Sequence, residues 1–221
     1  MFHSPFFISL KIALLATLLV FISGLFLAYK SLHWKKARKI MDIIFLLPMV
    51  LPPTVIGFFL LLFFSKQYPF GQFLDSVGIQ IIFSWWGGVF ASFIVAFPLM
   101  YRSVQSAMEQ MDENLCLVAR TLGMKEITIF WKIVIPNCIP GIVSGILLAF
   151  TRAFGEFGAT IMVAGNIPGK TQTISMAIYS AMQSGDFQTA YIWVACILLF
   201  STACILVMQY VTSYKWKKVE K

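Results

Sequence analysis

Long apolar runs alternate with short charged segments along the chain. Each run has roughly the 20 residues that a helix needs to cross the hydrocarbon core of a bilayer. There are five such runs, at residues 6–29, 43–64, 81–101, 139–163 and 190–212. The pattern predicts an all-α integral membrane protein with about five transmembrane helices. No polar stretch is long enough to bury a core of its own, so residues 1–221 are expected to form a single membrane domain.

The second run is interrupted by Pro48, Pro52 and Pro53. A proline removes one hydrogen bond from a helix and kinks it, and a membrane tolerates this where neighbours satisfy the freed backbone groups. Two interpretations stay open. Either the kink only shapes helix packing, or Pro52 and Pro53 form a hinge or gate beside a transport pathway.

The charged segment between the third and fourth runs, residues 109–136, carries signals for a short helix of its own. Asp112 can cap that helix, because its carboxylate can accept a hydrogen bond from a free N–H of the first turn. Gly123 stands where a helix usually ends in a left-handed residue. Between them, apolar residues repeat at the spacing of one helix face: Leu115, Val118, Ala119 and Leu122.

A second short helix is predicted from Lys125 to Ile135, ended by Pro136 and Pro140. The first helix has an apolar face but lies at the membrane surface between two spans. It must bury that face in something, and a partner protein in the cytoplasm is the natural candidate.

Composition supports the membrane assignment. The chain is 59% hydrophobic and 12% charged, with a mean hydropathy of +0.84, which is far more apolar than soluble domains of this size. The net charge of +8 does not indicate nucleic-acid binding, because the basic residues lie next to the apolar runs. The four cysteines and two histidines lack the spacing of a metal site, so no metal is expected.

Most lysines and arginines fall in three segments: the loop after the first run, with Lys30, Lys35, Lys36, Arg38 and Lys39; the central segment; and the tail, with Lys215, Lys217, Lys218 and Lys221. The positive-inside rule places all three in the cytoplasm. The N-terminus is then outside and the C-terminus is cytoplasmic, a parity that five spans satisfy.

Arg152 and Glu156 fall in the middle of the fourth run and can pair, since they are one helical turn apart. Charges inside a membrane are costly unless paired or wetted, and are therefore functional candidates. The pair can be a structural ion pair, or Arg152 can help an anion to pass. Gly155 and Gly158 beside it would let another backbone approach closely.

The segment AGNIPGKT, residues 164–171, nearly matches a nucleotide-binding P-loop. A P-loop joins a strand to a helix in a soluble domain, whereas this segment leaves a transmembrane run on the outer side. We expect a structured turn beside an outer gate, formed by Gly165, Asn166, Pro168 and Gly169.

The central segment resembles the EAA loop of ABC-importer permeases. That pattern, Glu-Ala-Ala, three residues, Gly, nine residues, Ile, one residue, Leu-Pro, falls on residues 117–119, Gly123, Ile133 and residues 135–136, although Leu117 and Val118 replace the first Glu and Ala. The resemblance implies a coupling helix that docks in a cleft of an ATPase subunit. The residues it implies in coupling are Leu115, Leu117, Val118, Ala119, Arg120, Leu122 and Gly123.

Other segments resemble the molybdate ABC-transporter permease family: LLPMVLPPTVIGF (residues 46–58), ARTLG (residues 119–123) and FGEFGATIMVAGNIPGKTQTISMAIY (residues 154–179). The resemblance implies a type I ABC-importer permease fold in the plasma (inner) membrane and a homodimer with a central pathway. It also implies cytoplasmic ABC ATPase subunits, which hold the ATP and Mg, and an extracytoplasmic molybdate-binding protein. This chain would hold no cofactor and would not itself be an enzyme.

Permeases for tungstate or sulfate are similar to this sequence in the same segments and stay open as alternatives. Two distant alternatives are a membrane enzyme acting on lipid and a structural membrane scaffold. An enzyme would need clustered His, Asp or Cys at an interface, and a scaffold would not need charges inside a span.

Overall fold

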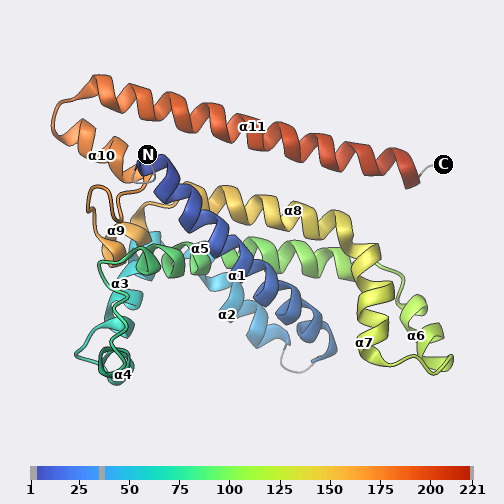
Figure 1. The fold of residues 1–221 in the computed structure, drawn as a ribbon. Coiled ribbons are helices and arrows are strands. Elements are labelled where there is room, and N and C mark those ends of the chain that lie inside the picture. Colours follow the sequence, from blue (N-terminus) through green and yellow to red (C-terminus); the bar gives the residue numbers. More distant parts are fainter. Residues whose placement is uncertain (1–3, 35–37, 220–221) are drawn as a thin grey trace.

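The computed structural model describes residues 4–34 and 38–219, and the regular structure in these ranges is entirely helical (Figure 1). Lys35, Lys36 and Lys221 lie outside the described residues. The elements are α1 (Pro5–His33), α2 (Arg38–Val50), α3 (Pro53–Phe64), α4 (Pro69–Ser76), α5 (Trp85–Glu109), α6 (Glu113–Thr121), α7 (Glu126–Ile129), η1 (Phe130–Val134), α8 (Ile135–Phe154), α9 (Gly158–Ala164), α10 (Ile174–Gln183) and α11 (Phe187–Val219).

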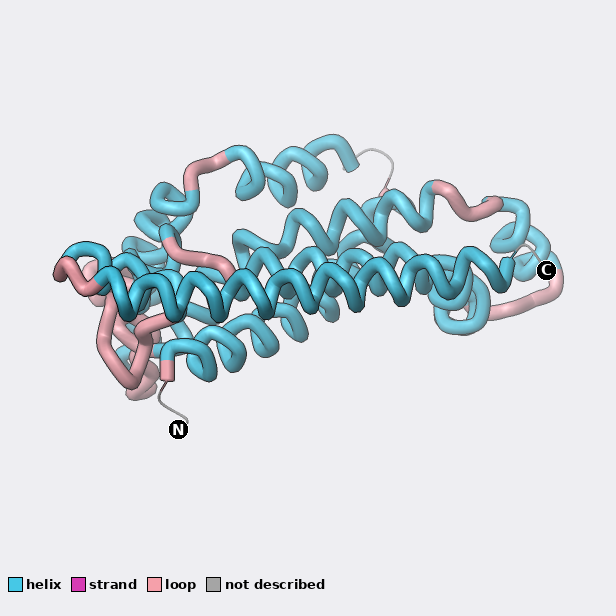
Figure 2. The backbone as a smooth tube through the Cα atoms, turned by 90° about the horizontal axis from the view of Figure 1, so that it is seen from above, coloured by secondary structure: helices cyan, strands magenta, loops and turns pink. Residues whose placement is uncertain are grey.

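The long helices run lengthwise through the molecule, and most loops gather at its two ends (Figures 1 and 2). The N-terminus, α9 and α10 lie at one end, whereas α6, α7 and the end of α11 lie at the other (Figure 1). This arrangement agrees with the orientation that the charge distribution predicts, since the charged central segment and the C-terminus share one side.

The core lies where α1, α5 and α8 pack together. Small residues bring the helices close, as is usual in membranes, where no hydrophobic force drives helices together. A Cβ atom at Gly88 would lie 2.8 Å from Ile12 Cδ1, and one at Gly145 would lie 2.8 Å from Met100 Sδ. Met100 and Tyr101 at this junction are fully buried.

Helix α11 lies along the outside of the bundle (Figure 1) and contacts chiefly α10 and α8. Only 6% of the most apolar 18-residue stretch of this helix is buried inside the protein. One anchor is Phe200, whose ring lies 4.5 Å from that of Phe154. The apolar surface that remains suits lipid, as a membrane-spanning helix at the edge of a bundle requires.

The described residues contain four helical runs that are long and apolar enough to cross a membrane, and the pair α2 and α3 makes a fifth candidate. The runs Pro5–Leu32, Trp85–Glu109 and Phe187–Val207 correspond to the first, third and fifth predicted spans. The second run was predicted to be kinked at its prolines, and it is sharply bent. The fourth was predicted as one uninterrupted helix, and that prediction was wrong. Residues 43–64 form α2 and α3, which meet at 112°, and residues 139–163 break between α8 and α9.

The predicted end of a helix at Pro136 and Pro140 was also wrong. The helical path continues from Glu126 through both prolines to Phe154. A π-helical segment, η1, precedes them, and the Ile135 N–H donates to the Phe130 carbonyl, five residues back. This wider turn lets the helix pass through prolines that would otherwise interrupt its backbone hydrogen bonds. A π-helical turn adds one residue to a helical turn and can bend a helix without ending it.

Candidate functional site

Helix α6 presents an apolar surface at the cytoplasmic end of the molecule. Asp112 caps it as predicted, its Oδ1 accepting from the Asn114 N–H at 3.0 Å. The exposed apolar residues are Leu115, Leu117, Val118 and Leu122, the last of them 75% exposed. Ala119, in contrast, is buried with Cys116 against the rest of the chain. The helix therefore has one side anchored on the rest of the chain and an apolar side free to contact another protein.

The anchored side of α6 is connected to α7 and α1 by polar contacts. Arg120 pairs with Glu126 on α7, with Nε 2.6 Å from Oε1, and Tyr29 on α1 donates to Glu126 Oε2 at 3.3 Å. The hydrogen bond to Glu126 raises the pKa of Arg120, and burial raises the pKa of the Cys116 thiol. These contacts fix the position of α6 relative to the first transmembrane helix.

The turn after α6 depends on Gly123. Its φ is +77°, a conformation that costs residues with a Cβ about 1–2 kcal/mol. The Met124 N–H donates to the Ala119 carbonyl at 3.1 Å, which satisfies a carbonyl at the end of the helix. The predicted stop at Gly123 is confirmed, and the space around its Cα is open.

Two helix breaks meet near the opposite end of the molecule. Pro52 precedes α3 and Pro53 begins it, so the first break lies at residues 51–52. The second lies at residues 155–157, between α8 and α9. They are in contact, because a Cβ atom at Gly158 would lie 3.1 Å from Pro53 Cβ. Nothing in the sequence indicated that the proline-containing break and the break after α8 would lie together, but in the fold they are in contact.

The close approach predicted for the two glycines holds at one of them. Gly158 packs against Pro53 and Thr54, whereas a Cβ atom at Gly155 would meet only the Thr151 carbonyl of its own helix, at 3.7 Å. On α3, Gly57 makes a second close approach, since its Cβ would lie 2.9 Å from the Ala159 Cα and carbonyl oxygen. Helices α3 and α9 are thus packed backbone to backbone.

Arg152 and Glu156 form the predicted ion pair, with 2.6 Å between Nη1 and Oε2. They lie at the end of α8 and in the break that follows it, and not within one continuous span. The Glu156 side chain is 2% exposed, and that of Arg152 is 34% exposed. Glu156 Oε1 also accepts from the Ala159 N–H at 2.8 Å. The carboxylate thus joins the end of α8 to the first turn of α9, where a negative charge is favoured by the helix dipole.

The segment that resembles a P-loop forms an internally bonded turn between α9 and α10. Gly165 and Gly169 have φ values of +67° and +73°. The Thr171 hydroxyl donates to the Gly165 carbonyl at 3.1 Å and accepts from the Ile167 N–H at 3.1 Å. The side chain of Asn166 donates to Ser180 Oγ at 2.6 Å. Pro168 also lies within this turn. The polar groups named here are used in hydrogen bonds that hold the turn in shape. The turn lies at the end of the molecule opposite α6 (Figure 1).

A polar network between α2 and α5 was missed in the sequence. Asp42 Oδ1 accepts from Tyr101 Oη at 2.5 Å and from Gln105 Nε2 at 2.9 Å. Arg38 pairs with Asp42 at 3.7 Å and also with Glu109. Asp42 and Gln105 are 63 residues apart, so spacing along the chain carried no signal. The network fixes the cytoplasmic part of α2 to α5.

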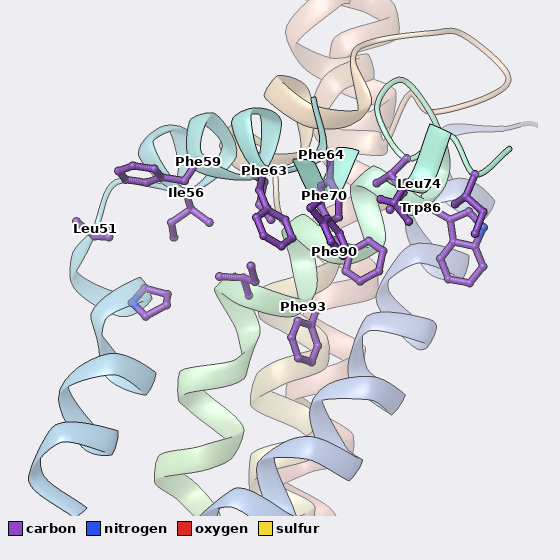
Figure 3. A pocket seen from close by; sticks show the side chains of 15 residues that line it. Leu51, Ile56, Phe59, Phe63, Phe64, Phe70, Leu74, Trp86, Phe90 and Phe93 are labelled. Atoms are coloured by element: carbon purple, nitrogen blue, oxygen red, sulfur yellow. The ribbon is translucent and has the colours of Figure 1, made fainter. Parts of the chain in front are cut away.

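An apolar cavity of about 850 Å³ lies under the bend between α2 and α3 (Figure 3). Side chains of α3 and α5 point into it, among them Phe63, Phe64, Phe90 and Phe93 (Figure 3). Such a lining of aliphatic and aromatic side chains suits hydrocarbon better than an anion. No group of three or more His, Cys, Asp or Glu side chains within residues 4–34 and 38–219 is placed to hold a metal ion.

The sequence matches the family described as "Binding-protein-dependent transport system inner membrane component" over residues 10–215. It is 41% identical over 179 residues to the molybdenum transport system permease protein ModB of Escherichia coli K12, covering 80% of this chain and 78% of that one. It is 32% identical over 200 residues to the sulfate transport system permease protein CysT of Salmonella typhimurium LT2, covering 90% of this chain and 72% of that one.

Among solved structures, the fold matches the MetNI methionine ABC transporter in an inward-facing conformation. The TM-score is 0.71 at 13% identity, covering 95% of this chain and 94% of that chain. This likeness confirms the predicted type I ABC-importer permease fold, and the family match extends along almost the whole chain. The chain belongs to the family of binding-protein-dependent transport system inner membrane components: it is a multi-pass ABC-importer permease, and not an enzyme.

Proposed function

We propose that two copies of this chain form a homodimer whose central pathway imports molybdate. Cytoplasmic ABC ATPase subunits would bind ATP and Mg and dock on α6 of each copy. An extracytoplasmic molybdate-binding protein would deliver the anion to the end that carries α9, α10 and the turn at residues 165–169. The membrane lipid would cover the exposed apolar surface of α11, and no nucleic acid takes part.

The observation that carries this proposal is the exposed apolar side of α6. Leu122 is 75% exposed and Val118 is 57% exposed, although both lie on a helix whose other side is anchored by Ala119. An apolar surface of this kind at the end of a transporter fits a partner better than water. The 41% identity to a molybdenum permease supports molybdate as the cargo.

A sulfate permease is the second candidate, supported by the 32% identity to CysT. Tungstate is a third, since it has the same charge and shape as molybdate. Uptake into vesicles that hold this chain, its ATPase and its binding protein separates them. We expect molybdate uptake that persists in excess sulfate. Strong competition by sulfate would assign the chain to the sulfate importers, and uptake independent of ATP would contradict the ABC mechanism.

A further inference from the structure

A second cavity, a groove of about 1160 Å³, lies between α5 and α8 on the cytoplasmic half of the molecule. It faces away from the buried side of α5, where Met100 and Tyr101 are fully buried in the core. The groove side of α5 instead carries Arg102, Ser103 and Ser106, at the spacing of one helix face. Arg102 lies seven residues before the end of α5 at Glu109, or about 10 Å along the helix axis.

The lining of the groove contrasts with that of the apolar cavity under the α2–α3 bend. Helix α8 contributes Asn137 and Ser144 to it, and Gln110, which directly follows α5, adds an amide beside the residues already named. One carboxylate, Asp112, also lines it, and its Oδ1 already accepts from the Asn114 N–H. The rest of the lining is largely apolar. The Ser103 hydroxyl is used within the bundle, because it donates to the Gly141 carbonyl at 2.9 Å. The groove therefore combines one guanidinium with a few hydroxyl and amide groups in mainly apolar walls.

The guanidinium of Arg102 is held in place by a buried amide. Its Nη1 donates to Gln105 Oε1 at 2.7 Å, and Gln105 is 0% exposed. The Nε2 of Gln105 donates in turn to Asp42 Oδ1 at 2.9 Å and to Tyr101 Oη at 3.3 Å. Neighbours that orient a binding group in this way are what a preorganised site requires.

Arg102 differs from the other arginines in the part of the chain that is described. Arg38, Arg120 and Arg152 each pair with a carboxylate, whereas the side-chain partner of Arg102 is a neutral amide. A guanidinium has five N–H donors, and one bond to Gln105 leaves donors for a second partner. Arg102 thus keeps its positive charge and can offer a planar pair of N–H groups to an oxyanion.

We propose that Arg102, with Ser106 and Ser144 lining the same groove, forms a transient oxyanion-binding site on the inner half of the pathway. This inference rests on the proposed import function and names the residues that meet the anion before its release. A single cation in a groove that also carries the Asp112 carboxylate suits a conduit, because a site that bound the anion tightly would slow its exit. Gln105 acts as a positioning residue that orients Arg102.

The first test is uptake by the assembled transporter in vesicles. We expect Arg102→Gln to lower molybdate uptake by about tenfold or more, because a charge-assisted hydrogen bond is lost, while the ATPase still copurifies. Arg102→Lys, which keeps the charge but not the planar pair, should keep much more of the activity. Lys39→Gln is the matched control, since it removes one positive charge from the exposed side of α2 and should leave uptake unchanged.

The outcomes separate this inference from the proposed function. If the wild-type transporter imports molybdate, tungstate and sulfate no faster than empty vesicles, the proposed function fails. If the wild type imports molybdate and Arg102→Gln imports it at the same rate, the site assigned to Arg102 is wrong and the import function stands.

A second test needs no variant of Arg102. A cysteine introduced by Ser144→Cys reports the potential of the groove through its reaction with methanethiosulfonate reagents of either charge. We expect the anionic sulfonatoethyl reagent to react faster than the cationic trimethylammonium reagent, relative to a small free thiol, by about tenfold at low salt. The parent chain gives the background from the native cysteines. Equal reactivity, or preference for the cation, would overturn the proposal.

Discussion

The ion pair between Arg152 and Glu156 allows a quantitative test of two explanations, a structural link or an anion contact. The pair connects α8 to α9 through a carboxylate that is 2% exposed and that also accepts from the Ala159 N–H. Replacing Arg152 by Gln leaves a buried carboxylate without its cation. Removing one partner of a buried pair costs about 3–5 kcal/mol, and the partial exposure of Arg152 favours the lower end of that range.

Replacing the other partner, Glu156, by Gln is expected to cost less stability. Glu156→Gln keeps an oxygen that can accept from Ala159, and Arg152, at 34% exposed, can reach water. Losing one charged hydrogen bond costs about 1.5–3 kcal/mol. In the double variant two amides face each other and no charge is buried. A structural pair therefore predicts that Arg152→Gln with Glu156→Gln is more stable than Arg152→Gln alone, with a coupling energy of about 2 kcal/mol.

Heat-induced unfolding of the four proteins in detergent, followed by tryptophan fluorescence, measures this order. The pair between Lys66 and Asp75 is the matched control, because its N–O distance is also 2.6 Å but its side chains are 71% and 53% exposed. Lys66→Gln should change stability by less than about 1 kcal/mol. A double variant as unstable as Arg152→Gln would refute the structural explanation. A stable double variant that no longer imports the anion would show that the pair, besides its structural part, is needed for import.

Three further predictions concern the two ends of the molecule. Gly123→Asp should reduce ATP hydrolysis stimulated by the binding protein while the chain stays in the membrane, because it adds a negative charge beside the apolar side of α6. Gly123→Asn, which tolerates a positive φ as well as Asp does but adds no charge, should keep it, and equal, normal rates in both would refute the coupling role. Leu122→Ser should weaken copurification of the ATPase and change stability by less than about 0.5 kcal/mol, because the side chain is exposed; unchanged copurification would contradict docking at this residue. Gly57→Val should cost about 1–3 kcal/mol by forcing α3 away from α9, which heat-induced unfolding checks; an unchanged midpoint would argue against their close packing.

The parts that the sequence predicted well are those in which local pattern decides structure. Apolar runs of sufficient length determined α1, α5 and α11. The cap at Asp112 and the stop at Gly123 determined α6, because both depend on residues within one turn. Asp112 and Gly123 were therefore assigned correctly, although α6 is only nine residues long.

The parts that could not be predicted depend on contacts between distant segments. The break at residues 155–157 contains no proline and is stabilised by Glu156, which connects α8 to the first turn of α9. Pro136 and Pro140 are strong stop signals, but a π-helical segment allows the helix to continue. The third run was predicted to end at residue 101, whereas α5 continues to Glu109. Its last two turns place Arg102 beside Gln105 and a groove formed with α8.

The two ends of this permease are joined by contacts that suggest how movement of α6 reaches the pathway. Glu126 receives Arg120 from α6 and Tyr29 from α1, so a force on α6 acts directly on the first transmembrane helix. Helix α1 packs against both α5 and α8, the helices that form the groove. The network of Arg38, Asp42 and Gln105 then connects α5 to α2, which leads to the 112° bend. If the ATPase docks on α6 as proposed, a displacement there would have a continuous path, through packed helices and charged hydrogen bonds, to the broken helices at the opposite end.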